Sequence, residues 1–359
     1  MTMLFMKKKY QLERFFVTWL MILFMILTDA FTAFAQVKQA TFLVNGISCD
    51  LEQGILKVEF VTPDVVRVQY TGENTFIGNG TDVCLPRAVD NPVRWVYTPN
   101  PDCYLLKSDS LIVRVDLSTA SITYLDKEGG LLLQEDQNIP RISEKRVTKQ
   151  VIYDEHSKHI EKTADGDKEI KNVLRYDTIG HTWKYRINFK WQPLEALYGW
   201  GAHMEDYMNL RGKELYLCQH NLKAMVPVLN STAGYGLLFD AGCAMMFKDN
   251  SEGSFVELEA AKQIDYYFMK GKTMDAVVAN YRLLTGNSPM MPLYLFGYIQ
   301  SKERYVSSDD LINTLKEYRQ RQIPIDMIVQ DWNYWPEGQW GTMSMNPKFY
   351  PDKRKLADE

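Results

Sequence analysis

The chain has 359 residues and a formal net charge of −4 at pH 7, with 46% hydrophobic and 24% charged residues. This composition is ordinary for a soluble globular protein, and the length predicts at least two domains. The acidic balance excludes the basic field that nucleic acid or an anionic membrane surface would require.

The first 35 residues have the layout of a secretory signal peptide. Lys7, Lys8, Lys9 and Arg14 form a basic start, and 15–27 is an apolar run broken only by Thr18. The small residues Ala33 and Ala35 then flank Phe34, as at a cleavage site. Because the run is too short to span a bilayer, we expect cleavage after Ala35, a secreted or periplasmic product and no membrane contact afterwards. The mature chain would carry a net charge of −6.

The five cysteines are Cys49, Cys84, Cys103, Cys218 and Cys243. Their odd number and wide spacing predict neither a zinc site nor a disulfide framework. They are typical of small buried apolar residues, although one or two bridges are compatible with an oxidising compartment.

Between about 38 and 268 the hydrophobic pattern has a period of two. Val66, Val68 and Tyr70 alternate with polar residues, and the run from Trp183 to Trp191 does so most clearly. Many such strands separated by turns indicate a β-sandwich. The highly charged segment 143–172 is expected to form exposed hairpins or a loop.

A helix is expected after Thr273, which can cap it, with an inner face of Met274, Val277, Val278, Tyr281 and Leu284. Gly286 ends it, and Pro289 and Pro292 follow. The sequence therefore predicts a signal segment over 1–35, a sandwich over 36–270, a helical connector over 271–291 and a further domain over 292–359.

The further domain begins as strand, helix, strand. We expect strands at Leu295–Gln300 and Ile325–Val329, with a helix from about Ser308 to Arg321 that Ser307 and Asp310 cap. A βαβ unit of this kind implies parallel strands.

Asp331 and the aromatic residues Trp332, Tyr334 and Trp335 follow the second of these strands directly. In α/β barrels the carboxyl ends of the strands form the active-site face. A carboxylate can accept hydrogen bonds from adjacent sugar hydroxyls, and aromatic rings can pack on the C–H face of a pyranose. On the residues alone, Asp331 could equally cap the next turn while the aromatic rings fill core space.

Several ordered motifs resemble glycoside hydrolase family 31, the α-glucosidase and α-xylosidase family. They are Tyr198-Gly199-Trp200-Gly201, Leu210-Arg211-Gly212-Lys213, the segment 234–240, the segment 297–305 and the segment 323–332. The resemblance implies a galactose-mutarotase-like β-sandwich followed by the first strands of a (β/α)₈ TIM barrel, incomplete in this chain. It also implies a retaining α-glycosidase that needs no cofactor and no metal.

By the same resemblance, Asp331 matches the family's carboxylate that binds the non-reducing sugar, and Trp332 matches its neighbour in that subsite. Asn221 matches, more loosely, a sandwich loop that contributes to substrate binding. Glu303 replaces an aromatic residue common in the α-glucosidases, which favours an α-xylosidase. Glu303 could also be an ordinary surface carboxylate.

Retaining glycosidases use two catalytic carboxyl groups about 5–5.5 Å apart. The family's nucleophile lies in a Trp-x-Asp-x-x-Glu signature that is absent between 293 and 359. Asp326 is expected inside a strand and so is no substitute. We therefore expect an N-terminal part of a longer enzyme that is inactive by itself and whose partner is an oligosaccharide or polysaccharide, such as xyloglucan fragments. The alternatives are a non-catalytic carbohydrate-binding sandwich and a secreted structural protein.

Overall fold

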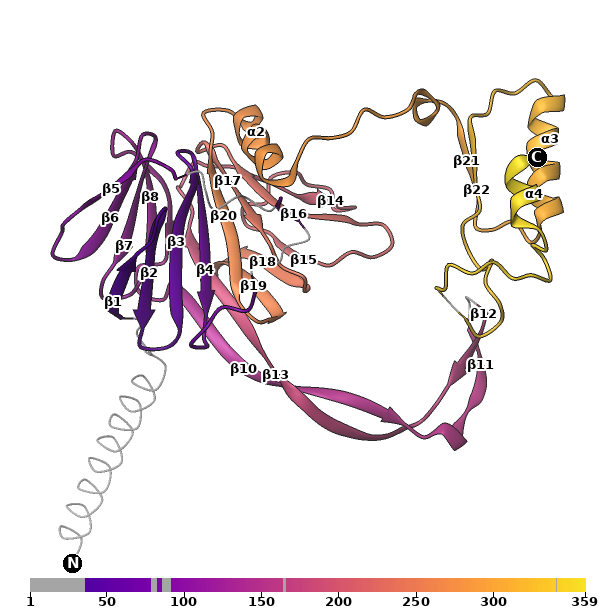
Figure 1. Ribbon diagram of the computed structural model, residues 1–359, viewed down its shortest axis with the longest axis horizontal. Coiled ribbons are helices and arrows are strands. Elements are labelled where there is room, and N and C mark those ends of the chain that lie inside the picture. The colour runs from indigo at the N-terminus through magenta and orange to yellow at the C-terminus, as the bar shows by residue number, and fades with distance from the viewer. Residues whose placement is uncertain (1–35, 79–82, 86–91, 164–165, 340) are drawn as a thin grey trace, which may run out of the picture. The chain divides into compact units, whose positions relative to one another are not determined.

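The computed structural model describes residues 36–78, 83–85, 92–163, 166–339 and 341–359 (Figure 1). The predicted signal segment lies outside these residues. They divide into two compact units: one contains the residues up to Thr148 with Ile179–Asn287, the other Lys149–Thr178 with Ser288–Glu359. No helix among the described residues is long and apolar enough to cross a membrane.

The first unit is a β-sandwich. One of its sheets has eight strands in the order β1-β2-β3-β4-β20-β17-β16-β14, and its printed pairings are antiparallel. These strands are β1 Val37–Phe42, β2 Gly46–Leu51, β3 Ile55–Thr62, β4 Val65–Thr71, β14 Leu197–Ala202, β16 Ala224–Ser231, β17 Tyr235–Phe239 and β20 Ile264–Lys270.

The other sheet has ten strands, in the order β15-β18-β19-β13-β9-β8-β7-β6-β5, with β10 paired to β13. The strands are β5 Trp95–Thr98, β6 Cys103–Ser108, β7 Leu111–Asp116, β8 Ile122–Asp126, β9 Leu131–Glu135, β10 Arg141–Tyr153, β13 Val173–Lys190, β15 Glu214–Leu217, β18 Met245–Asn250 and β19 Gly253–Ala261. A continuous hydrophobic core lies between the two sheets. The alternating residues Val66, Val68, Tyr70, Tyr185 and Ile187 belong to this core, because alternate side chains of a strand point to one face.

The charged segment predicted as exposed hairpins or a loop is built that way. It contains most of β10, the short helix η1 Glu155–Ser157, the hairpin of β11 His159–Thr163 with β12 Gly166–Ile170, and the approach to β13. Its ion pairs, such as Lys171 with Glu155 at 2.6 Å, lie at the surface. All five cysteines are free thiols, and three of them are buried.

Helix α2, Met274–Thr285, covers the outer face of the eight-stranded sheet, where its apolar side chains join a second, smaller core. Thr273 caps it as predicted, since its hydroxyl accepts a hydrogen bond from the amide of Ala276 at 3.3 Å. The predicted inner face is too wide: Val277 and Leu284 are buried, whereas Met274 and Val278 are exposed. The close contact is centred on Val277, since a Cβ at Gly236 would lie 2.4 Å from Val277 Cγ1.

The second unit contains the predicted strand, helix and strand. Strand β21, Ile299–Ser301, and strand β22, Met327–Val329, are parallel, as expected. Helix α3, Ser308–Gln320, connects them and is capped by Ser307, whose hydroxyl accepts a hydrogen bond from Asp310 N at 3.2 Å. Helix α4, Lys353–Asp358, follows.

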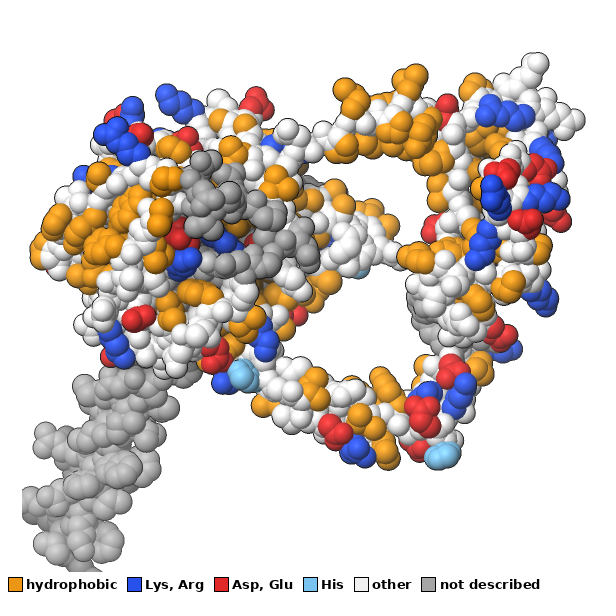
Figure 2. All heavy atoms as spheres, in the orientation of Figure 1, with side chains coloured by type: hydrophobic (Ala, Val, Ile, Leu, Met, Phe, Trp, Pro, Cys, Tyr) orange, Lys and Arg blue, Asp and Glu red, His pale blue; other side chains and the backbone are white. Residues whose placement is uncertain are grey.

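Both strands are shorter than predicted. Residues Leu293–Phe296 coil into the 3₁₀ helix η2 after Pro292, and Gly297 N closes this turn onto Tyr294 O at 3.2 Å. The apolar run therefore does not continue as a strand into β21. Met290, Leu293 and Phe296 are among its most exposed side chains, and Figure 2 shows hydrophobic side chains gathered along this segment.

Candidate functional site

The candidate site lies at the carboxyl ends of β21 and β22. The register pairs Ile299 with Met327 and Ser301 with Val329. Beyond the strands, the amide of Trp332 donates to the carbonyl oxygen of Glu303 at 3.0 Å. The predicted site residues Glu303, Asp331 and Trp332 are therefore held on two neighbouring segments at one end of this small sheet.

Asp331 is exposed. Within the described part of the chain, no group is recorded in a hydrogen bond or ion pair with its carboxylate. The next turn is made possible by Asn333, whose φ of 53° is in the left-handed region that asparagine tolerates. The alternative in which Asp331 caps this turn is therefore not supported by a recorded contact.

Three aromatic rings lie directly beside Asp331 in sequence and contact one another. The ring centroids of Trp332 and Trp335 are 5.2 Å apart at an interplanar angle of 80°. Those of Tyr334 and Trp335 are 5.4 Å apart, and the Tyr334 hydroxyl donates to Met343 Sδ at 3.3 Å. Edge-to-face packing of this kind fixes the ring orientations. The cluster provides half-buried aromatic surface on the segment that directly follows Asp331.

A cluster of hydrogen-bonded side chains surrounds Gln300 in β21. The sequence analysis assigned no role to its members. The Gln300 Oε1 atom accepts hydrogen bonds from the hydroxyls of Tyr298 and Tyr318, both at 2.6 Å. The Gln300 amide nitrogen donates to the hydroxyl of the buried Tyr305 at 3.3 Å. The available signal was spacing, because residues 298 and 300 share one face of an extended segment.

Gln330, directly before Asp331, has a side-chain amide whose nitrogen and oxygen are both buried. Among the described residues, neither atom has a hydrogen-bond partner. An unpaired buried amide costs free energy. A further polar group that hydrogen-bonds to the Gln330 amide would remove this cost.

Asp326 is not inside β22, as the sequence suggested, but immediately before it. Its carboxylate accepts a hydrogen bond from Tyr298 N at 3.0 Å. Because it precedes the strand, it lies at the end of β22 opposite to Asp331. Asp326 therefore cannot replace a catalytic carboxylate, because it lies at the opposite end of the strand from Asp331. The predicted reason, a position inside the strand, does not hold.

Asn221 belongs to the first unit, in the turn between β15 and β16. This turn is closed by a bridge between His220 and Lys223 and contains Leu222 with a φ of 70°. Asn221 is exposed at its tip. The structure thus places Asn221 on a protruding sandwich turn, while the other three predicted residues lie in the second unit.

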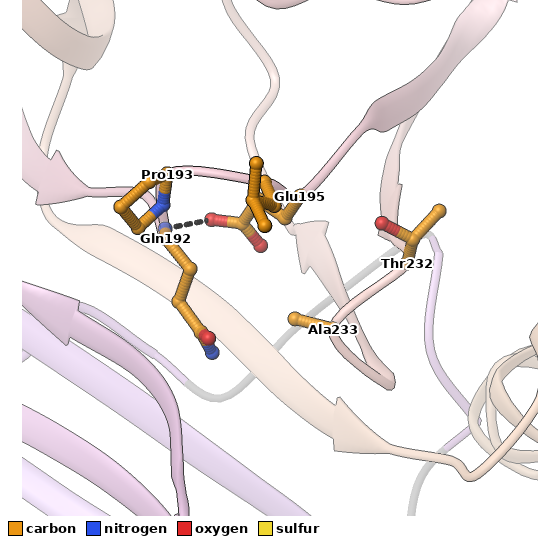
Figure 3. A pocket seen from close by; sticks show the side chains of 6 residues that line it. Gln192, Pro193, Glu195, Thr232 and Ala233 are labelled. Carbon is orange, nitrogen blue, oxygen red and sulfur yellow. Dashed lines mark hydrogen bonds between the residues drawn. The ribbon is translucent and has the colours of Figure 1, made fainter.

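The sandwich also has a cavity of about 350 Å³ lined by Gln192, Pro193, Leu194, Glu195, Thr232 and Ala233. Figure 3 shows the Glu195 carboxylate turned toward the amide of Gln192. The same carboxylate accepts hydrogen bonds from Ser231 and Tyr235. No aromatic ring lines this cavity, and its carboxylate already has three donors.

Comparison with known proteins agrees with this architecture. Residues 55–247 match the glycosyl hydrolase 31 N-terminal galactose mutarotase-like domain, and residues 288–359 match the glycosyl hydrolases family 31 TIM-barrel domain. The chain belongs to glycoside hydrolase family 31. It is a mutarotase-like sandwich followed by the start of a TIM barrel, as the sequence motifs predicted.

An α-xylosidase of Saccharolobus solfataricus is 27% identical over 313 residues, which cover 85% of this chain and 38% of that protein. The α-glucosidase 2 of Bacillus thermoamyloliquefaciens is 22% identical over 308 residues, covering 81% of this chain and 34% of the relative. A family 31 α-xylosidase from a soil metagenome, solved with xylose, has a TM-score of 0.66 at 22% identity and covers 89% of this chain and 45% of its own. The chain thus spans less than half the length of these proteins, and its similarity to them supports membership of a glycosidase family.

Proposed function

We propose that this family 31 chain is the substrate-binding N-terminal part of a retaining α-glycosidase, with an α-xylosidase preference. The observation that carries the proposal is the exposed Asp331 carboxylate, which has no recorded partner in the described chain and follows β22 beside the rings of Trp332 and Trp335. The proposed ligand is the non-reducing end of an α-xyloside or α-glucoside, for instance a xyloglucan fragment.

The chemistry of binding follows from these groups. A carboxylate without internal partners can accept hydrogen bonds from two adjacent sugar hydroxyls, and such charge-assisted bonds are stronger than neutral ones. The indole rings offer apolar surface to the C–H face of the sugar. By the family resemblance, Glu303 stands where α-glucosidases often carry an aromatic residue, as in the α-xylosidases, in which large side chains elsewhere in the pocket would exclude the hydroxymethyl group of glucose.

We further propose that residues 36–359 bind sugar without hydrolysing it. Retention needs a nucleophile and an acid/base about 5–5.5 Å apart. The nucleophile signature of the family is absent between 293 and 359. We also propose that the chain is exported, on the strength of its first 35 residues.

The binding test is a titration of residues 36–359 with methyl α-xyloside and methyl α-glucoside, followed by NMR. We expect saturable binding that favours the xyloside and falls about tenfold or more in Asp331→Asn, because a charged acceptor is lost. The matched control is Asp309→Asn, an exposed carboxylate in the first turn of α3. Unchanged binding in Asp331→Asn would refute the assignment, and sustained sugar release by the purified chain would refute the proposed lack of activity.

A non-catalytic carbohydrate-binding sandwich is the second candidate, and the cavity beside Glu195 would be its binding site, although the lining has no aromatic ring. In that case binding would survive Asp331→Asn, and the shifted resonances would be those of Thr232 and Ala233.

A further inference from the structure

A cluster of three side chains, His203, Glu205 and Lys223, connects two loops of the sandwich. Glu205 lies between them: its Oε1 atom is 3.1 Å from Lys223 Nζ, and its Oε2 atom is 4.0 Å from His203 Nδ1. The three side chains are largely enclosed, with 29% of Glu205, 15% of Lys223 and 9% of His203 exposed. Their enclosure makes the ion pair less screened than one at the surface.

At its His203 end, this cluster contacts a segment of β14 that has unusual backbone angles. Trp200 has a φ of 61°, and its carbonyl oxygen is 2.7 Å from His203 Nε2. The neighbouring Gly199 and Gly201 also have positive φ, and a Cβ at Gly201 would lie 1.8 Å from Ala224 O. His203 therefore donates a hydrogen bond to a backbone bulge, in which glycine at 199 and 201 permits the positive φ.

At its Lys223 end, the cluster contacts the turn that carries Asn221. Lys223 closes that turn with a hydrogen bond from its amide to His220 O at 3.1 Å. The Gln219 side chain adds two more, donating to Lys223 O at 2.6 Å and accepting from Met225 N at 3.0 Å. The position of Lys223 thus determines how the turn, with Asn221 at its tip, is presented.

The tautomer of His203 is set by its hydrogen-bond partner. A carbonyl oxygen only accepts hydrogen bonds, so Nε2 must carry the proton that it donates to Trp200 O. Both His203 Nδ1 and Glu205 Oε2 are buried, and neither has a hydrogen-bond partner in the described part of the chain.

We propose that Glu205 is a positioning residue for the Asn221 turn, which it holds through its ion pair with Lys223. This inference rests on the proposed glycosidase function and on the role in sugar binding that the family resemblance implies for Asn221. The Lys223 hydrogen bond lowers the pKa of Glu205, so the carboxylate stays charged at neutral pH. Tyr207 also interacts with Glu205, because its pKa is raised by burial and then by the Glu205 charge. Lys213 Nζ lies 4.8 Å from the Tyr207 ring centroid.

The test is hydrogen exchange of the Lys223 and Met225 amides, compared with their intrinsic rates, in residues 36–359. We expect Glu205→Gln to speed their exchange about tenfold, because the charge-assisted bond that holds the Lys223 side chain is lost. Glu252→Gln, in the turn between β18 and β19, is the matched control and should leave both amides unchanged. Lys223→Met should speed exchange as Glu205→Gln does. Lys223→Arg keeps the positive charge and should keep both amides protected.

Exchange that is indifferent to Glu205→Gln would overturn the proposal. Faster exchange with unchanged sugar affinity would support the positioning role and count against the sugar-binding role of Asn221.

Discussion

Gly297 lies directly against the side chain of Asp326, and a Cβ at Gly297 would be 2.0 Å from Asp326 Oδ2. The same carboxylate accepts the hydrogen bond from Tyr298 N that fixes the start of β21 beside β22. The two residues therefore set the parallel alignment that brings Glu303 and Trp332 together at the other end.

We predict that Gly297→Ala destabilises the second unit by about 1–3 kcal/mol, the usual cost of forcing an atom into occupied space. Asp326→Ala should also destabilise it, through loss of the Tyr298 hydrogen bond. Because Asp326→Ala removes the atom that the new Cβ meets, the double variant should be less destabilised than the sum of the two. Hydrogen exchange of the β21 and β22 amides measures each effect, and strict additivity would contradict the proposed contact.

The buried pair of Glu135 and Arg141 gives a second prediction. Glu135 is fully buried and also accepts hydrogen bonds from Tyr266 at 3.0 Å and from Ile122 N at 2.8 Å. Arg141→Met would leave this carboxyl without its cation, at a cost of about 3–5 kcal/mol in the free energy of unfolding. Urea denaturation measures it. Arg146→Met breaks the exposed pair with Glu144 and should cause no measurable change.

The pH dependence of that variant follows from the direction of the shift. Burial raises the pKa of Glu135, although Arg141 opposes this. A raised carboxyl pKa means that the folded state retains its proton more readily, so the associated stability is present at low pH and is lost as pH rises. Without Arg141 the neutral form is favoured further. The cost of Arg141→Met should therefore be smaller in acid than at neutral pH, and a larger cost in acid would contradict this account.

Asp249 gives a pH dependence of the opposite sign, because its pKa is lowered in the folded state. Although burial favours its neutral form, hydrogen bonds from Ser254, from Gly212 N at 2.7 Å and from Arg211 Nε at 2.9 Å lower its pKa. Asp249→Asn should reduce the free energy of unfolding by about 2 kcal/mol at neutral pH. Because the folded pKa is lowered, the wild type loses this advantage as pH falls through it, below the ordinary aspartate range. Asp102→Asn, at an exposed position, is the control, and a pH-independent difference would count against the prediction.

Export is tested at the N-terminus. We predict that the exported product begins at Gln36, because the short apolar run and Ala33-Phe34-Ala35 suit cleavage there. Edman sequencing or mass spectrometry of the secreted protein reads this directly. Ala35→Tyr should block cleavage, and a wild-type product that retains Met1 would show that the segment is not a cleaved signal.

Local features of the sequence determined much of this protein. Alternation marked the core strands at Val66–Tyr70 and Tyr185–Ile187, and Thr273 and Ser307 marked two helix starts, because each signal depends on residues only a few positions apart. The same reasoning placed Asp331 after a parallel strand. Only the tertiary structure decided that Phe296 is not in a strand, that Glu135 meets Tyr266, and that Glu205 joins the Trp200 bulge to the Asn221 turn. These contacts depend on sheet register and on which polar groups are enclosed together, and both arise from pairings between segments that are distant in the chain.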